Sequence, residues 1–219
     1  MGGYRRQGHG RYPSMSNSAI KSLLVAPVRW SLRATAALRK YGWRLYFHAA
    51  LAQQLSFDLP ASVVVMGYGR VYGTGAIRFG EDALLFGDLF LETLGSGSIS
   101  LGDSVVISRG VHLAAMAGIA IGRGTMIGEY TSIRDASHRR VDGLPLRDGG
   151  FTAKPIVLGS EVWVGRGVAI LGGVTIGDGA TIGANAVVTR DVPAGATYAG
   201  VPARPIQSRS EMEAFARGR

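Results

Sequence analysis

Histidine is the side chain in this sequence best suited to proton transfer near neutral pH. A free imidazole has a pKa of about 6.5, so a neutral ring can accept a proton there. His138 is one of four histidines, the others being His9, His48 and His112. It lies where a regular repeat gives way to a polar, turn-rich stretch, whereas a lone histidine inside regular structure is more often a packing residue. We therefore take His138 as the candidate general base.

The 219 residues contain no cysteine. A disulfide framework, a cysteine nucleophile and cysteine-ligated zinc are therefore excluded. A zinc-dependent hydratase would need three imidazoles. Only His112 and His138 lie in the repeat region, without a third histidine to complete the set, so no metal is expected.

The element that must position these residues is a six-residue repeat between Leu158 and Val192. A strict step of six fits neither the 3.6-residue period of a helix nor the two-residue period of a strand. It predicts a solenoid of short strands and tight turns, with the repeated apolar residues inside. The aliphatic markers are Leu158, Val164, Ile170, Ile176, Ile182 and Val188, each followed four residues later by Val162, Val168, Val174, Ala180, Ala186 and Val192.

The same step is present earlier in the chain, with two irregularities. The six-residue spacing of the apolar markers is interrupted between Ala114 and Ile119, which predicts a small bulge or loop at one corner. Residues 138–155 break the pattern with Arg, Asp, Gly and Pro, and such an interruption is a candidate functional loop. We assign residues 58–206 to the solenoid. The earlier markers are Phe79, Leu85, Leu91, Leu101, Ile107, Leu113, Ile121, Ile127 and Ile133.

The N-terminal 57 residues differ in composition. They hold nine of the 24 basic residues and no Asp or Glu, while the remainder is neutral overall. We expect residues 1–16 to be a disordered basic arm and residues 17–57 to be helical. Pro27 is expected to end a short first helix near Val25, before a longer helix to about Leu55.

Two interpretations of residues 17–57 stay open. The segment caps the end of the solenoid or packs on another subunit, or it makes a peripheral membrane contact through its basic stripe. No apolar run is long enough to cross a bilayer, and no signal peptide is evident, so we expect a cytoplasmic protein, with membrane association at the inner face left open. Because the basic charge is confined to this segment, no nucleic-acid partner is expected.

The segments flanking His138 resemble a known family. Over about residues 99–207 the chain is similar to hexapeptide-repeat acyltransferases of the galactoside and maltose O-acetyltransferase type. The first 57 residues lie outside this resemblance. The matching segments are Ser132–His138, Pro155–Gly159, Val162–Gly165, Gly173–Ala180, Ile182–Pro193 and Gly200–Arg204.

The resemblance implies an all-β solenoid, a left-handed parallel β-helix, with an N-terminal helical extension and a short C-terminal helix within 207–219. It implies a homotrimer with active sites between subunits and acetyl-CoA as co-substrate. It makes His138 the base that deprotonates a hydroxyl of a sugar, a polysaccharide precursor or another small molecule, with direct acyl transfer. The alternative function is a non-catalytic trimeric scaffold docked to a membrane or partner by the basic helix.

The family's binding residues carry over position by position. Trp163 matches the tryptophan beside the acceptor and the thioester, and it could instead be a subunit-interface anchor. Ala184 and Thr189 could equally be plain solenoid packing. The expected acetyl-CoA contacts are Arg166, Ala184, Thr189, Arg190 and Arg204.

Two acceptor positions depart from the family. Its acceptor-binding asparagine falls on Ser108, and an acidic contact falls on Met116. Methionine cannot accept a strong hydrogen bond, so we expect Asp135 or Glu129 to supply the acidic contact instead.

Overall fold

The computed structural model describes residues 18–206. The predicted arm at 1–16 and the predicted C-terminal helix at 207–219 lie outside the described residues. The chain divides into two units, residues 1–42 and residues 43–219.

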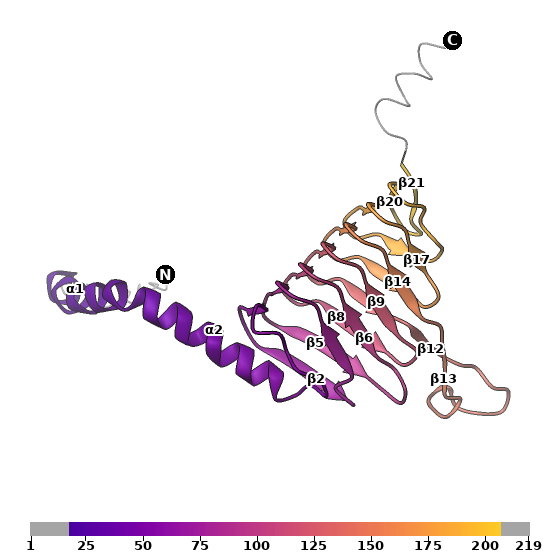
Figure 1. The fold of residues 1–219 in the computed structure, drawn as a ribbon, viewed down its shortest axis with the longest axis horizontal. Coiled ribbons are helices and arrows are strands. Elements are labelled where there is room, and N and C mark those ends of the chain that lie inside the picture. Colours follow the sequence, from indigo (N-terminus) through magenta and orange to yellow (C-terminus); the bar gives the residue numbers. More distant parts are fainter. Residues whose placement is uncertain (1–17, 207–219) are drawn as a thin grey trace, which may run out of the picture. The chain divides into compact units, whose positions relative to one another are not determined.

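Three sheets, here called A, B and C, form the three faces of the solenoid (Figure 1). Each coil passes through one short strand of sheet A, then B, then C. Parallel pairing between coils, such as Ile127 with Val164 and Ile133 with Ile170, stacks equivalent repeat positions. The chain is a left-handed parallel β-helix, which confirms the expected fold class.

The strands have these bounds. Sheet A contains β1 (Val64–Val65), β4 (Leu84–Leu85), β7 (Val106–Ile107), β10 (Met126–Ile127), β15 (Trp163–Val164), β18 (Thr181–Ile182), β20 (Thr197–Ala199) and the antiparallel β21 (Arg204–Pro205). Sheet B contains β2 (Gly69–Gly73), β5 (Leu89–Thr93), β8 (His112–Ala115), β11 (Ser132–Arg134), β16 (Ala169–Leu171) and β19 (Val187–Val188). Sheet C contains β3 (Ile77–Phe79), β6 (Ile99–Leu101), β9 (Ile119–Ile121), β14 (Ile156–Leu158) and β17 (Thr175–Ile176), and β12 (Ala136–His138) and β13 (Phe151–Ala153) form a separate hairpin around the 3-10 turn η1 (Leu146–Asp148).

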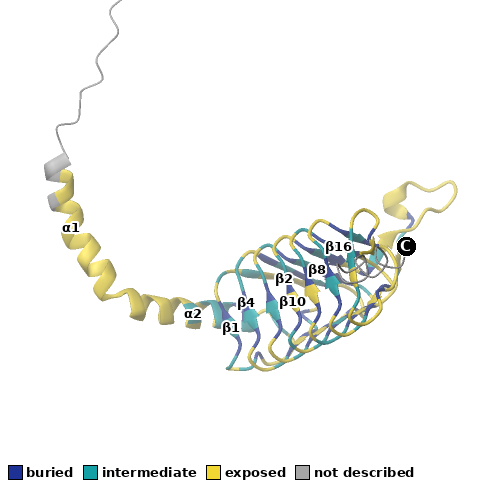
Figure 2. Ribbon diagram, turned by 90° about the horizontal axis from the view of Figure 1, so that it is seen from above, coloured by how far each residue is buried: buried dark blue, intermediate teal, exposed yellow. Residues whose placement is uncertain are grey.

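The markers of the six-residue step line the interior of the solenoid. Leu158, Val164 and Ile170 are at most 1% exposed, and the corner residues Val162 and Val168 are buried equally well. In Figure 2 the buried residues recur from one coil to the next along the solenoid. Full burial of one such side chain contributes about 1.5–3 kcal/mol. The repeat therefore predicted the core correctly, including the less regular coils before His138.

Glycines in the repeat serve two different purposes. Gly165 follows a marker, and a Cβ there would lie 2.7 Å from the backbone nitrogen of Ala184 in the next coil. Two residues later Gly167 has a φ of +67°, the left-handed region that the corner requires. Tyr130 and Asn185 hold the equivalent left-handed position with φ near +59° and +58°. The glycine after the marker therefore permits close stacking of coils, and the turn itself is made further on.

The N-terminal helices differ from expectation at Pro27. The helix α1 (Ser18–Ala34) continues through this proline, and α2 (Ala36–Ala52) follows after a break at Thr35. A proline withdraws a single backbone donor, which α1 tolerates. The break at Thr35 is one residue long: Thr35 N still donates to Ser31 O at 3.0 Å, and the Thr35 hydroxyl donates to the same oxygen at 2.8 Å. The prediction that Pro27 separates the helices is therefore wrong. Within residues 18–206, no helix has both the length and the apolar character needed to cross a membrane.

The last turns of α2 cap the open end of the solenoid. Leu51 is 1% exposed, and Phe47 and Leu55 pack against the core. The Phe47 ring lies 4.9 Å from that of Tyr68, and His48 Nδ1 lies 3.0 Å from Val63 O. This part of residues 17–57 is a cap, as one of the two interpretations expects.

Candidate active site

His138 lies on the β12–β13 hairpin, which leaves the solenoid at the corner between sheets B and C (Figure 1). The two strands are antiparallel, and His138 is directly opposite Phe151. One residue further out, Arg139 N donates to Gly150 O at 2.9 Å. The non-repeat stretch expected from the sequence therefore begins with a hydrogen-bonded pair of strands, and the candidate base His138 lies on the first of them.

The His138 imidazole is exposed and is supported by one aromatic neighbour. Its ring centroid lies 4.5 Å from that of Phe151, with 37° between the ring planes. Aromatic contacts of this kind contribute about 0.5–1.5 kcal/mol beyond the buried area. The contact restricts the imidazole, while its exposure lets an acceptor reach it.

Asp135, at the base of the hairpin, is structural. It is 1% exposed, and its carboxylate accepts hydrogen bonds from the backbone N–H groups of Met116, Ala117 and Gly118 at 2.7–3.0 Å. These three residues are the corner where the six-residue beat slips, so the carboxylate closes the predicted bulge. An acceptor cannot reach a carboxylate enclosed in this way, which corrects the expectation that Asp135 binds substrate.

A groove on sheet A contains four of the expected site residues, Ser108, Trp163, Arg166 and Ala184. It has a volume of about 400 Å³. Trp163 is 60% exposed because its strand neighbour Val164 points into the core. The small residues Gly165, Gly183 and Ala184 form the floor of the groove and leave it open. The groove extends from sheet A onto the corner between sheets A and B.

Charged and polar groups line one end of this groove. Arg166 and Glu129 both contribute, and the Arg166 guanidinium carbon lies 5.6 Å from the Tyr130 ring centroid. Ser108 supplies a half-buried hydroxyl. The groove therefore offers a cation, a carboxylate and an indole within one surface, and Glu129, unlike Asp135, has an accessible carboxylate.

Two buried threonines fix the coil that carries the groove to the next one. Thr125 Oγ1 donates to Gly159 O at 2.8 Å and accepts from Val162 N at 3.1 Å. Thr131 Oγ1 donates in the same way to Gly165 O at 3.0 Å. Because Trp163 directly follows Val162, the first pair of bonds holds the backbone under the indole.

The remaining expected cofactor contacts lie outside the groove lining. Thr189 and Arg190 follow β19 and are exposed at the corner between sheets B and C, the corner from which the His138 hairpin leaves in an earlier coil. Arg204 is exposed on β21, where its Nη1 donates to Ala203 O at 2.9 Å.

The expected site residues therefore fall into two groups on one chain. Ser108, Trp163 and Arg166 line the sheet A groove, whereas His138 and Arg190 lie at the corner between sheets B and C. Sheet B and its outward side chains separate the two groups. The sheet A groove includes Trp163 but not His138, and the hollow under the hairpin includes neither residue.

Comparison with known proteins agrees with this architecture. Residues 155–190 match the model of the bacterial transferase hexapeptide (six repeats). The chain is 34% identical over 141 residues to WbbJ of Escherichia coli K12, named for an O-acetyl transferase role in lipopolysaccharide biosynthesis, covering 61% of this chain and 72% of that protein. This chain belongs to the hexapeptide-repeat acyltransferase family.

Other relatives and structures extend the comparison. Nodulation protein L of Rhizobium meliloti is 42% identical over 108 residues, covering 49% of this chain and 58% of that protein. A crystal structure of a mutant AntD, an N-acyltransferase from Bacillus cereus, in complex with dTDP and coenzyme A, superposes with a TM-score of 0.58 at 21% identity, covering 73% and 90% of the two chains. At that identity the superposition shows the shared fold.

The acyltransferase has two further hollows on sheet B. A small one of about 80 Å³ lies under the hairpin and includes Glu92, Arg134 and Phe151. Sequence reasoning missed all three. Arg134 was discoverable, because it directly follows the buried marker Ile133 and must point outward, but Phe151 falls in a stretch without periodicity.

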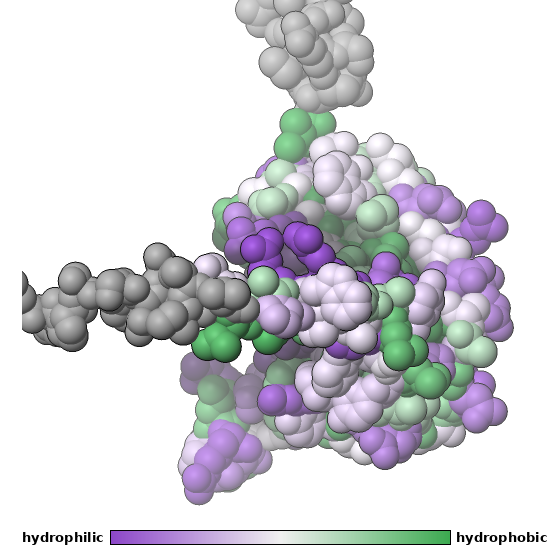
Figure 3. Space-filling view, turned by 90° about the vertical axis from the view of Figure 1, so that its left-hand side faces the viewer, coloured by the Kyte–Doolittle hydropathy of each residue, from purple (hydrophilic) through white to green (hydrophobic). Residues whose placement is uncertain are grey.

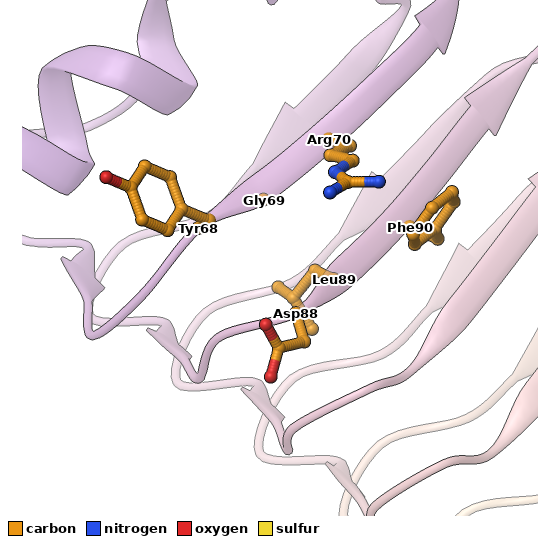
Figure 4. Close-up of a pocket in the computed structure, with 6 residues that line it drawn as sticks. All are labelled: Tyr68, Gly69, Arg70, Asp88, Leu89 and Phe90. Atoms are coloured by element: carbon orange, nitrogen blue, oxygen red, sulfur yellow. The ribbon is translucent and has the colours of Figure 1, made fainter.

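The other hollow lies near the N-terminal end, over β2 and β5, and measures about 380 Å³. Figure 4 shows the Arg70 side chain between the strands beside Phe90, with Asp88 at the corner. Asp88 pairs with Arg109 at 3.2 Å, and interactions with Tyr46 raise the pKa of Tyr68. This hollow is lined by no histidine, its carboxylate Asp88 is paired with Arg109, and it lies on earlier coils than the hairpin, so we do not place the active site there.

Proposed function

We propose that this acyltransferase transfers an acetyl group from acetyl-CoA to a hydroxyl of a sugar or polysaccharide precursor, with His138 as general base. The observation that carries the proposal is the exposed imidazole on an ordered hairpin. A relative supports it, since WbbJ is named for O-acetyl transfer in lipopolysaccharide biosynthesis.

The sheet A groove has the chemistry that acetyl-CoA requires. Its floor of Gly165, Gly183 and Ala184 leaves room for the narrow pantetheine arm, and Trp163 offers an apolar wall. Arg166 can meet a phosphate, because a guanidinium presents several donors to such an anion. Thr189, Arg190 and Arg204 would make further contacts from exposed positions. AntD structures bound to coenzyme A share this fold.

In the proposed reaction the His138 imidazole takes the proton of the acceptor hydroxyl. The hydroxyl oxygen attacks the thioester carbonyl, a C–O bond forms, and the C–S bond breaks. The imidazolium then gives its proton to the departing thiolate, so His138 returns to its neutral form. General-base assistance of this kind contributes about 10²–10⁴ in rate. No covalent acyl-enzyme is involved.

We propose that the active unit is a homotrimer in which His138 of one copy meets the Trp163 groove of the next. The separation of the two groups on one chain supports this arrangement. The outward residues of the sheets also differ. The outward row of sheet A is apolar on five adjacent strands, with Val64, Leu84, Val106, Met126 and Trp163. The outward row of sheet C is mixed, with Arg78, Ser100, Ala120, Val157 and Thr175. An exposed apolar row marks an interaction surface, and closed symmetry is usual for copies of one chain.

The acceptor hydroxyl would lie between His138 and the groove, within reach of Ser108 and Glu129. Serine is shorter than the family's asparagine and offers one hydroxyl in place of an amide. We therefore expect an acceptor different from a simple galactoside or maltose.

The test is thiol release from acetyl-CoA by the full chain, measured with a panel of sugars, nucleotide sugars and longer saccharides. Release that depends on both acceptor and enzyme, with an ester in the product, supports the proposal. An amide product on an amino sugar would refute the O-specificity. A folded trimer that neither binds CoA nor acts on any acceptor would favour the scaffold alternative, whereas CoA binding counts against it.

A further inference from the structure

The segment before the cap exposes many large apolar side chains. On α1, Leu24, Val28 and Trp30 are 69%, 55% and 73% exposed. Tyr41 and Leu45 on α2 are 67% and 72% exposed. This segment is outside the cap proper, and the solenoid core does not use these side chains.

Two of the three cations of α1 lie on the other side of the helix, while Lys21 shares the side of Leu24 and Val28. Arg29 and Arg33 are one helical turn apart and share one side, while Leu24 and Val28 are also one turn apart and face roughly opposite. Trp30 lies between the two sides. An apolar side, a basic side and an aromatic residue at the boundary are typical of helices that lie in a membrane interface.

The basic charge of the segment is uncompensated. Within residues 18–57 there are six Lys or Arg and no Asp or Glu, and Asp58 is the first acidic residue. None of the ion pairs among residues 18–206 includes one of these six cations. A surface of this kind is complementary to anionic lipid headgroups.

A second, independent feature lies where α2 meets the first coil. Arg44, Leu45 and His48 line a pocket of about 280 Å³ together with residues 61–65. Arg44 Nε is buried there without a hydrogen-bond partner. A buried guanidinium donor without a partner costs free energy, which a phosphate oxygen in the pocket would recover. In the view from this end, hydrophobic, weakly polar and strongly hydrophilic side chains lie next to one another (Figure 3).

We propose that the enzyme docks on an anionic lipid bilayer through α1 and the exposed part of α2, with a lipid phosphate bound by Arg44. The apolar side chains Leu24, Val28 and Trp30 enter the interface, and Arg29 and Arg33 remain at headgroup level. Because the end of α2 is packed on the first coil, docking holds the solenoid at the bilayer surface. This function is separate from acyl transfer.

The experiment uses the full chain and sedimenting vesicles of phosphatidylcholine alone or with phosphatidylglycerol. Binding is expected only with the anionic lipid, and it should weaken as salt rises. A basic residue near an anionic surface contributes a factor of about five in partitioning, so R29Q/R33Q should bind about 25-fold more weakly. W30A and R44Q should each weaken binding, the second without loss of the apolar contact.

The matched control R123Q/R147Q removes the same charge from exposed positions, one on a solenoid corner and one on the hairpin, and should bind like the wild type. Equal binding to both vesicle types, or unchanged binding of R29Q/R33Q, would overturn the proposal. If W30A instead changes the molecular mass in solution without affecting vesicle binding, the segment packs on another copy and the membrane proposal fails. Because binding is measured without substrate, a failed acetyl-transfer assay does not affect this result.

Discussion

His138 and Phe151 face each other across the two strands of the hairpin, with their ring centroids 4.5 Å apart. A strand pair fixes both backbones, so the phenyl ring is a fixed support for the imidazole. The proposed base is thus held by an element outside the repeat, whereas the sheet A groove, on the other side of sheet B, is part of the repeat.

Replacing His138 with Ala should lower kcat by about 10²–10⁴, since the acceptor hydroxyl loses its proton acceptor. The side chain is exposed, so the thermal unfolding midpoint should stay unchanged. Thiol release and calorimetric CoA binding would be measured together. A variant that turns over at the wild-type rate would remove His138 from the mechanism.

Replacing Phe151 with Ala should lower kcat by about ten-fold while leaving the KM for acetyl-CoA unchanged, because imidazole orientation is lost and the groove is intact. F151Y keeps the ring and should restore most of the rate. A drop of equal size in both variants, or a changed KM for acetyl-CoA, would argue against a positioning role for the Phe151 ring.

Replacing Asp135 with Ala should destabilise the fold by about 3 kcal/mol, because three buried N–H donors lose a charged acceptor. Chemical denaturation would measure the change. The matched control D142A removes an exposed carboxylate from the hairpin and should leave stability within about 0.5 kcal/mol. If the stability of D135A is unchanged, the carboxylate does not brace the corner.

Replacing Trp163 with Ala should raise the KM for acetyl-CoA and leave stability nearly unchanged, since the indole is 60% exposed. R166Q should act in the same direction by removing a cation from the groove. Substrate titration with each variant separates binding from rate. An effect confined to kcat would place Trp163 against the reacting atoms rather than along the cofactor.

Mixing H138A and W163A subunits tests whether the site lies between copies. In randomly reassembled trimers, about a quarter of the interfaces would join an intact His138 to an intact Trp163. At acetyl-CoA concentrations well below the raised KM of W163A, where both parent variants are inactive, about a quarter of the wild-type activity should therefore return. The two variants refolded separately and then combined without exchange provide the baseline. If co-refolding restores nothing above that baseline, the two residues do not act across an interface.

The six-residue repeat alone was enough to predict the solenoid, its core and its corners. Markers such as Leu158 and Ile170 are buried because each six-residue unit contains one short strand and one turn, so every sixth residue takes the same inward position. The same regularity placed Trp163 on an outward position, since it stands next to a marker. His138 was singled out because it ended the pattern.

Only the tertiary structure decided the roles of residues whose partners are distant in sequence. A carboxylate beside the candidate base, such as Asp135, is a plausible substrate contact from sequence alone. In the structure it accepts hydrogen bonds from the backbone N–H groups of Met116 and Gly118, about twenty residues earlier in the chain. Phe151 gained its place opposite His138 only through hairpin pairing, and Thr35 rather than Pro27 divides the helices. A local repeat fixes which side of a coil a residue faces. The stacking of coils and the reversal of the chain in the hairpin bring residues distant in sequence into contact, and a local repeat does not encode such contacts.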